Sequence, residues 1–126
     1  MSFTILGVDH VMVTTPEELE DDVVEWYERG LGLQRIPKPD GTRPGAGAWF
    51  RVGDQEVHVS IEDHNPDRTA HFGLVVDDFG AIVQRIRELG CHIEQAPTIP
   101  GRKRCFTHDP AGNRVEILSF EETDAR

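Results

Sequence analysis

The stretch "HDPAGNRVEIL", from His108 to Leu118, decides the fold. Proline and glycine follow Asp109 within three residues, a composition typical of a tight turn between two strands. Beyond the turn the residues alternate, so that Val115 and Ile117 lie on one face of a strand and Glu116 lies on the other. Such alternation is common in any half-exposed strand. A special role for the Glu116 carboxylate therefore depends on polar residues at equivalent positions elsewhere in the chain.

The chain contains the same order of five predicted elements twice. The first half has a strand at 8–15, an amphipathic helix at 16–33 and three short extended segments, "QRIPKP", "GAWFRVG" and "QEVHVSIE". The second half has a strand at 70–78, a helix at 79–90 and the segments "HIEQAP", "RKRCFTHD" and "NRVEILSF". Asp77 or Asp78 caps the start of the second helix. The sequence predicts one α+β domain, residues 1–126, made of two βαβββ modules at about 5–62 and 68–120.

Four polar residues occupy equivalent places in the two modules. Two of them open the first strands, and the other two lie in the last strands. With a period of two residues, each points away from the continuous apolar face of its strand, which belongs under a helix. All four are expected on the face that the helices leave uncovered: His10, His71, His58 and Glu116.

This pattern resembles the vicinal oxygen chelate superfamily, also called the glyoxalase/bleomycin-resistance/dioxygenase fold. The resemblance extends from "LGVDHVMV" to "DPAGNRVEIL", and "FTHDPAGNRVEIL" closely follows the D-P-x-G-N signature of the second module. It implies a cupped, mostly antiparallel mixed sheet with the helices on its outer face. It also implies a homodimer, because pairing covers the open sheet edges of a two-module chain.

The resemblance further implies one divalent metal ion inside the cup, bound by His10, His58, His71 and Glu116. Three imidazoles and a carboxylate form a mixed nitrogen and oxygen site that suits Zn, Ni, Co, Mn or Fe(II). If the register of the first module differs by a few residues, Glu56 and Glu62 are the alternatives to His58.

A metal-dependent lyase or isomerase of the glyoxalase-like class is the leading functional hypothesis. In this chemistry a small oxygen-chelating substrate forms a metal-stabilised enediolate, and a carboxylate, Glu116 or Glu56, moves the proton. One alternative is an extradiol-type dioxygenase, with His10, His71 and Glu116 on Fe(II). Another is a non-catalytic drug- or metabolite-binding protein of the bleomycin-resistance type.

The remaining residues of interest have weaker patterns. We interpret His64, His92 and His108 as solvent-facing or turn residues. Four residues of the middle strands are candidates to line the cup: Trp49, Arg51, Arg104 and Phe106. The basic run "GRKRC", at 101–105, would best serve a small anionic substrate.

Composition excludes several classes of protein. A net charge of -10 argues against nucleic acid as a partner, because phosphate binding requires clustered cations. Cys91 and Cys105 have no CxxC partners, which favours a reducing, cytoplasmic location. The N-terminal segment carries no basic region, and no apolar stretch approaches the ~20 residues that cross a bilayer, so neither a signal peptide nor membrane binding is predicted.

Overall fold

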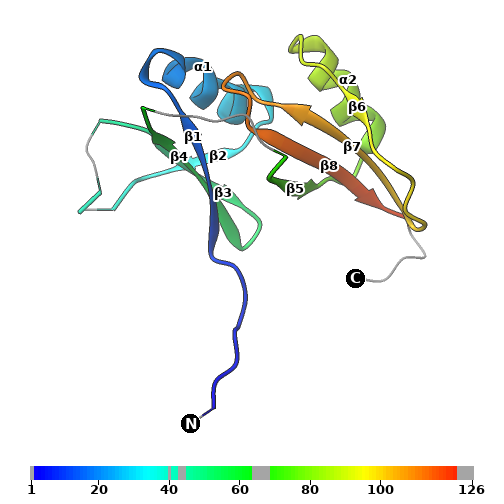
Figure 1. The fold of residues 1–126 in the computed structure, drawn as a ribbon, viewed down its shortest axis with the longest axis horizontal. Coiled ribbons are helices and arrows are strands. Elements are labelled where there is room, and N and C mark those ends of the chain that lie inside the picture. Colours follow the sequence, from blue (N-terminus) through cyan, green and yellow to red (C-terminus); the bar gives the residue numbers. More distant parts are fainter. Residues whose placement is uncertain (1, 40, 43–44, 64–68, 122–126) are drawn as a thin grey trace.

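Two four-stranded sheets lie side by side in the computed structural model, with the helices over them on the same side (Figure 1). The structure describes residues 2–39, 41–42, 45–63 and 69–121. The N-terminal sheet has the order β1-β4-β3-β2, with β1 at His10–Thr15, β2 at Gln34–Ile36, β3 at Ala48–Val52 and β4 at Gln55–Ile61. The C-terminal sheet has the order β5-β8-β7-β6, with β5 at His71–Val75, β6 at Glu94–Gln95, β7 at Arg102–His108 and β8 at Arg114–Phe120. The predicted α+β class and the repeated element order are confirmed.

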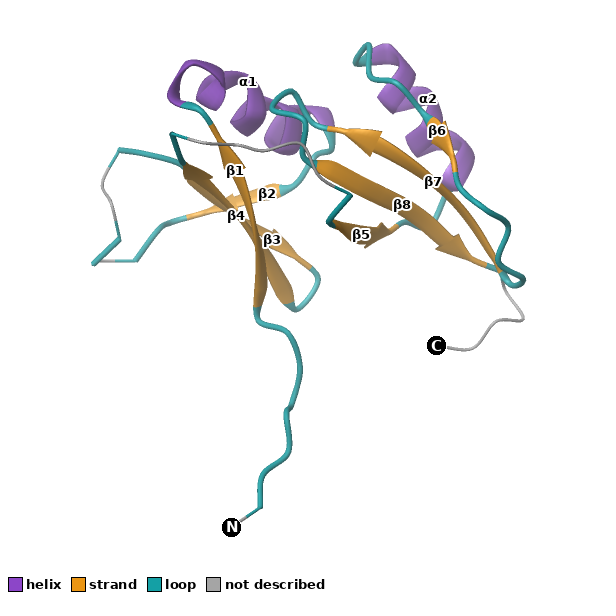
Figure 2. Ribbon diagram, in the orientation of Figure 1, coloured by secondary structure: helices purple, strands orange, loops and turns teal. Residues whose placement is uncertain are grey.

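Each sheet is mixed, with one parallel pair and two antiparallel pairs. The parallel pairs are β1 with β4 and β5 with β8. β1 and β5 are both edge strands, and neither belongs to the ladder of the other sheet. We call the side of each sheet that the helices leave uncovered the cup face (Figure 2).

The helix-covered faces hold the core, as the period-two pattern predicts. On the N-terminal sheet Phe50, Val57 and Val59 are at most 3% exposed, and on the C-terminal sheet Val115 and Ile117 are fully buried. Burial of such side chains contributes roughly 1.5–3 kcal/mol each. The alternate residues of the same strands therefore occupy the cup faces, where His58 and Glu116 were predicted.

The first helical region has three parts where the sequence predicted one continuous helix. A 3-10 turn at Glu17–Leu19 precedes α1 at Glu20–Glu25, and a π-helical segment follows at Trp26–Gly30. Trp26 and Tyr27, at the start of the π segment, are both buried, as their spacing of three and four residues from the buried Val23 predicts.

The second helix, α2 at Phe79–Glu88, starts as predicted. The Asp78 side chain accepts a hydrogen bond from the Ala81 backbone N–H at 3.0 Å, which selects Asp78 over Asp77 as the cap. Within the described residues, neither helical region is long and apolar enough to span a bilayer.

The turn between β7 and β8 is built around the buried side chain of Asp109. Its Oδ1 accepts hydrogen bonds from the backbone N–H groups of Ala111 and Asn113, at 2.9 and 3.0 Å. Its Oδ2 accepts from Asn113 Nδ2 and from the Tyr27 hydroxyl, both at 2.8 Å. Burial raises the pKa of the Asp109 carboxyl, and these hydrogen bonds oppose that rise.

This turn also joins the two modules. Tyr27 belongs to the π segment of the N-terminal module, and Asn113 Nδ2 donates to the Thr14 carbonyl of β1 at 2.8 Å. Nearby, Arg85 of α2 donates to the Gly30 and Arg29 carbonyls at 3.0 and 3.1 Å. Polar contacts therefore supplement apolar packing between the sheets.

We predict that Tyr27→Phe lowers the free energy of unfolding by about 1–3 kcal/mol, because the buried Asp109 carboxylate loses a donor that water cannot replace. Urea unfolding followed by circular dichroism measures the change. Thr42→Val is the control, since the Thr42 hydroxyl bonds within its own turn to the Pro39 carbonyl; it should stay within about 0.5 kcal/mol. Equal effects of the two substitutions would contradict the role given to Tyr27.

Candidate functional site

The strand registers confirm that the two cup faces carry equivalent positions. In the N-terminal sheet Met12 pairs with His58, and His10 pairs with Glu56. In the C-terminal sheet Gly73 pairs with Glu116, and His71 pairs with Arg114. Each sheet thus has a histidine on its first strand and a candidate ligand on its last strand, in the same relation. His10 corresponds to His71, and His58 corresponds to Glu116.

The C-terminal sheet brings His71 and Glu116 together. His71 Nε2 lies 3.3 Å from Glu116 Oε1. On its other side the carboxylate meets Arg104, whose Nε and Nη2 lie 3.0 and 3.3 Å from Oε2 and Oε1. These hydrogen bonds hold the pKa of Glu116 below its usual value, against the opposing effect of partial burial. Glu116 is therefore ionised at neutral pH and held in one orientation.

The N-terminal sheet holds a stack of three rings. The His58 ring lies between His10 and Trp49, with ring centroids 4.1 and 3.7 Å away. His58 Nε2 is 2.9 Å from Glu56 Oε1, and Arg51 Nη2 is 3.6 Å from Glu56 Oε2. Packing on both ring faces fixes the plane of His58, and Glu56 fixes the direction of its Nε2 atom.

The four predicted metal ligands therefore form two pairs, one on each sheet. No three His, Cys, Asp or Glu side chains among residues 2–39, 41–42, 45–63 and 69–121 form a cluster that could hold an ion. The four-ligand site remains a prediction, and one chain presents it as two halves. Glu56 belongs to the N-terminal half, whereas Glu62 is exposed beyond the end of β4.

Other predicted positions divide between the cup and the surface. The registers place Trp49, Arg51, Arg104 and Phe106 on the cup faces. In the basic run, Arg102 and Arg104 share the cup face, while Lys103 points to the opposite side of β7.

The three remaining histidines differ from one another. His92 is exposed, and His108 is a half-buried residue at the end of β7, opposite Arg114. His64 lies outside the described residues.

Two further residues of this region were not identified from the sequence as functional. Arg114 shares the cup face with Glu116, and its guanidinium carbon lies 3.8 Å from the centroid of the Phe106 ring. Asp109 organises the turn that starts β8. Alternation alone places Arg114 on the same face as Glu116, but it cannot distinguish a stacked arginine from a solvated one.

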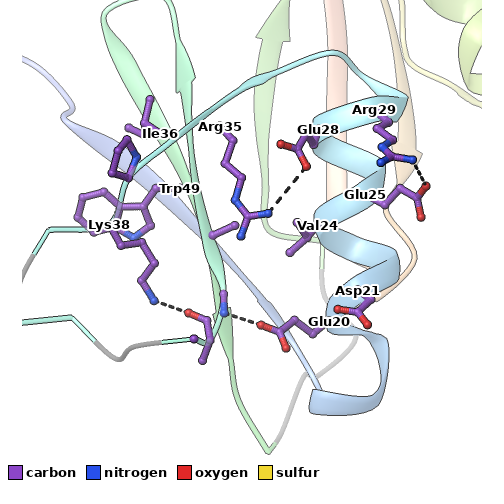
Figure 3. Close-up of a pocket in the computed structure, with 15 residues that line it drawn as sticks. Glu20, Asp21, Val24, Glu25, Glu28, Arg29, Arg35, Ile36, Lys38 and Trp49 are labelled. Atoms are coloured by element: carbon purple, nitrogen blue, oxygen red, sulfur yellow. Dashed lines mark hydrogen bonds and ion pairs between the residues drawn. The ribbon is translucent and has the colours of Figure 1, made fainter.

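A separate pocket of about 580 Å³ lies between α1 and the β2–β3 connection (Figure 3). Glu28 and Arg35 approach within 3.8 Å across it, Glu20 accepts a hydrogen bond from the Gly47 N–H, and Lys38 donates to the Ala46 carbonyl. None of the four predicted metal ligands lines this pocket. Two of its contacts join the helix to the β2–β3 region: the Glu28–Arg35 ion pair and the Glu20–Gly47 hydrogen bond.

A sequence profile of the Glyoxalase/Bleomycin resistance protein/Dioxygenase superfamily matches residues 7–117. The chain belongs to this superfamily. Superfamily members commonly bind a divalent metal, and its enzymes act on small molecules. Membership confirms the resemblance found in the sequence, while leaving the reaction of this chain undefined.

Among the superfamily relatives, "Probable lactoylglutathione lyase, chloroplastic" from Arabidopsis thaliana is 26% identical over 111 residues. The match covers 78% of this chain and 32% of that protein, so the chain spans about a third of its length.

Two solved structures have the same fold. A "putative glyoxalase family protein" from Bacillus anthracis is 31% identical, with a TM-score of 0.87, and the match covers 96% of this chain and 100% of that one. A fosfomycin resistance protein from Listeria monocytogenes, complexed with Mn(II), is 12% identical, with a TM-score of 0.78 and coverage of 94% and 95%. At 12% identity the second similarity concerns the fold alone.

We predict that Arg104→Gln raises the pKa of Glu116 toward its usual value, because the charged donors are lost. In the wild type, the pKa of Glu116 is lower in the folded protein than in the unfolded chain, where it is about 4.3. This difference stabilises the folded protein at pH values above about 4.3, and the stabilisation is lost as the pH falls through the pKa of the folded state. Arg104→Gln should therefore be less stable than the wild type at neutral pH, and the difference in stability between the two proteins should be smaller in acid. Carbon NMR titration of the metal-free carboxyl tests this, with Arg51→Gln as the control that leaves Glu116 unchanged.

Proposed function

We propose that this protein is a metal-dependent lyase or isomerase of the glyoxalase-like class, acting on a small molecule with two neighbouring oxygens. The observation that carries the proposal is the His71 and Glu116 pair, repeated at equivalent positions by His10 and His58. The lactoylglutathione lyase relative supports the lyase class. The two free thiols, Cys91 and Cys105, support a reducing, cytoplasmic location.

The donor atoms of the C-terminal half suit a divalent ion. Two ligand atoms at about 2.0–2.2 Å from one ion in tetrahedral geometry lie roughly 3.3–3.6 Å apart. The 3.3 Å between His71 Nε2 and Glu116 Oε1 matches this separation. Arg104 holds the carboxylate through Oε2, 3.0 Å from its Nε atom, and its Nη2 atom lies 3.3 Å from Oε1, so a bound ion would share Oε1 with this longer hydrogen bond. When bound, an ion from the set Zn, Ni, Co, Mn or Fe(II) would polarise the substrate oxygens.

We propose that two copies of the chain complete the site. Each copy offers one half on each sheet, and the halves do not form a single cluster within the described chain. A two-fold dimer would then combine the N-terminal half of one copy with the C-terminal half of the other, producing two equal sites.

The N-terminal arm, residues 2–9, supports a homodimer. It projects from the start of β1, away from both sheets (Figure 1). Phe3, Ile5 and Leu6 are 83%, 80% and 96% exposed. An exposed segment with several large apolar side chains usually marks an interface, because leaving these side chains in water is unfavourable. The second copy is the occupant that we propose.

Glu56 is the better placed of the two predicted proton carriers. Both oxygens of Glu116 are held by Arg104, and Oε1 also faces His71. Glu56 lies on the cup face of the opposite half, where Arg51 Nη2 is farther away, 3.6 Å from Oε2, and His58 Nε2 lies 2.9 Å from Oε1. In this division Glu116 serves as a ligand, and Glu56 moves a proton on the substrate carbon next to its oxygens.

The shared site predicts complementation between two damaged chains. A chain with His10→Ala and His58→Ala should bind no metal, and neither should a chain with His71→Ala and Glu116→Gln. Refolded together, they should form heterodimers in which one site has all four ligands and the other has none. We expect one metal ion per heterodimer by mass spectrometry of the native complex.

Each double variant on its own is the control for this experiment. Each variant alone should remain metal-free while keeping a mass near twice the 14.2 kDa of one chain. If the four ligands belong to one chain, mixing cannot restore a site. A correctly formed heterodimer that recovers no metal would therefore contradict the proposal that two chains share the site. A wild-type protein that binds no divalent metal would contradict the proposal that the site binds metal at all.

The role of Glu56 predicts a separate effect on proton transfer. Wild-type protein with its metal should exchange the carbon-bound protons of dihydroxyacetone for deuterium, as followed by NMR. Glu56→Gln should lower the exchange rate by about 100-fold or more while leaving metal content unchanged. The control is Glu62→Gln, an exposed carboxylate beyond β4. Full exchange in Glu56→Gln, or iron-dependent oxygen consumption by the wild type, would contradict this assignment.

A further inference from the structure

The cup face of the C-terminal sheet is rich in arginine. The β7–β8 and β5–β8 registers place three guanidinium groups on this face, those of Arg102, Arg104 and Arg114. We propose that Arg114 binds an oxyanionic group of the substrate, a carboxylate or a phosphate, beside His71. This inference rests on the proposed function, since it assigns a substrate class to the same cup.

Arg114 is held rigidly by an aromatic ring. Its guanidinium carbon lies 3.8 Å from the centroid of Phe106, and the side chain is 17% exposed. Phe106 also meets the His71 ring edge to face, with centroids 4.9 Å apart. Stacking engages the flat face of a guanidinium and leaves the N–H groups along its edge to bind an anion.

The donors of Arg114 are poorly satisfied within the described chain. Its Nε atom is buried and has no hydrogen-bond partner among the described residues. Its Nη2 atom lies 3.5 Å from Glu94 Oε1, at the limit of a hydrogen bond, and the Glu94 side chain is 49% exposed. A buried donor without a partner is costly, so an incoming oxyanion would gain a strong, charge-assisted bond.

The neighbouring arginine is already engaged. Arg104 directs Nε and Nη2 to Glu116 and Nη1 to the Pro97 carbonyl at 2.8 Å. Arg102 lies over Phe120, four residues along β7 from Phe106. Arg102 Nε is likewise buried without a hydrogen-bond partner among the described residues, but Arg102 lies at the start of β7, opposite Phe120. Of the three arginines, Arg114 is the one whose strand position pairs with His71.

A small pocket adjoins Arg114. It has a volume of about 180 Å³ and lies where β1 passes β5 and β8, lined by Arg114, His71 and the apolar side chains of Met12, Val11 and Phe72. A pocket of this volume has room for several water molecules, or for a small anionic group with a short apolar neighbour. Its polar wall is formed by Arg114, His71 and Asn113.

The equivalent position of the other sheet has the opposite charge. Arg114 pairs with His71 as Glu56 pairs with His10. In a chain of net charge -10, an anion requires such a local cation to overcome general repulsion. An uncharged substrate would not need an arginine at this place.

Inorganic phosphate is the probe for this inference. We expect full-length protein treated with chelator to bind it, as followed by phosphorus NMR, and Arg114→Gln to weaken binding by about 10-fold or more. Lys103→Gln is the matched control, because it removes the same charge from the opposite side of β7. Glu94→Gln should strengthen binding, since it removes the carboxylate nearest to the guanidinium, and it offers a second test at an exposed position.

The outcomes separate this inference from the proposed function. Arg114→Gln should keep its metal content and melting temperature, so a loss of metal would show a structural role and overturn the inference. Unchanged phosphate binding in Arg114→Gln, or an equal loss in Lys103→Gln, would also overturn it. A wild type that binds no metal would refute the proposed function, yet the phosphate comparison in chelated protein would still decide the role of Arg114.

With metal present, glycerol 3-phosphate and glycerol complete the test. Both offer neighbouring hydroxyl groups, but only the first carries an oxyanion. The wild type should prefer glycerol 3-phosphate by about 10-fold or more, and Arg114→Gln should lose this preference. Equal affinities of the wild type for the two compounds would contradict an anionic substrate.

Discussion

The hydrogen bond between Tyr27 and Asp109 is the contact on which the arrangement of the two modules depends. The sheets share no ladder, so backbone pairing cannot set their relative position. Asp109 Oδ2 instead receives the hydroxyl of one module and the Asn113 amide of the other, and Asn113 reaches β1 at Thr14. Because this carboxylate is buried, its partners must stay in place to compensate for lost water.

The same contact determines where the site begins. β8 starts directly after this turn, with Arg114 and Glu116 as its first cup-facing residues. A displaced Asp109 would move both the carboxylate predicted to bind metal and the arginine beside it. The D-P-x-G-N turn thus both joins the two modules and positions the site residues of β8. For this reason, this turn predicts both the fold and the site from the sequence.

Much of the fold follows from the sequence, because strand alternation and the module repeat are local patterns. They place His58 and Glu116 on the uncovered faces, as the structure confirms. They do not determine whether the two modules of one chain or of two chains share a site. The spacing of His10 and His71 shows that they occupy equivalent positions in the repeat, but it does not give the distance between their side chains. The π segment was also not predicted, because Trp26 and Tyr27, three and four residues after Val23, fit the apolar face of a regular α-helix equally well. The availability of Arg114 depends on Phe106 and Glu94, which are distant in sequence.

The difference between Glu56 and Arg114 has a stereochemical consequence. Two modules with identical cup faces would surround a substrate with near two-fold symmetry, and a small chelating molecule could then enter in either of two orientations. An acidic group on one half and a basic group on the other remove that ambiguity. A substrate with a charged end would present the same prochiral face to Glu56 at every turnover, so the reaction would yield a single enantiomer.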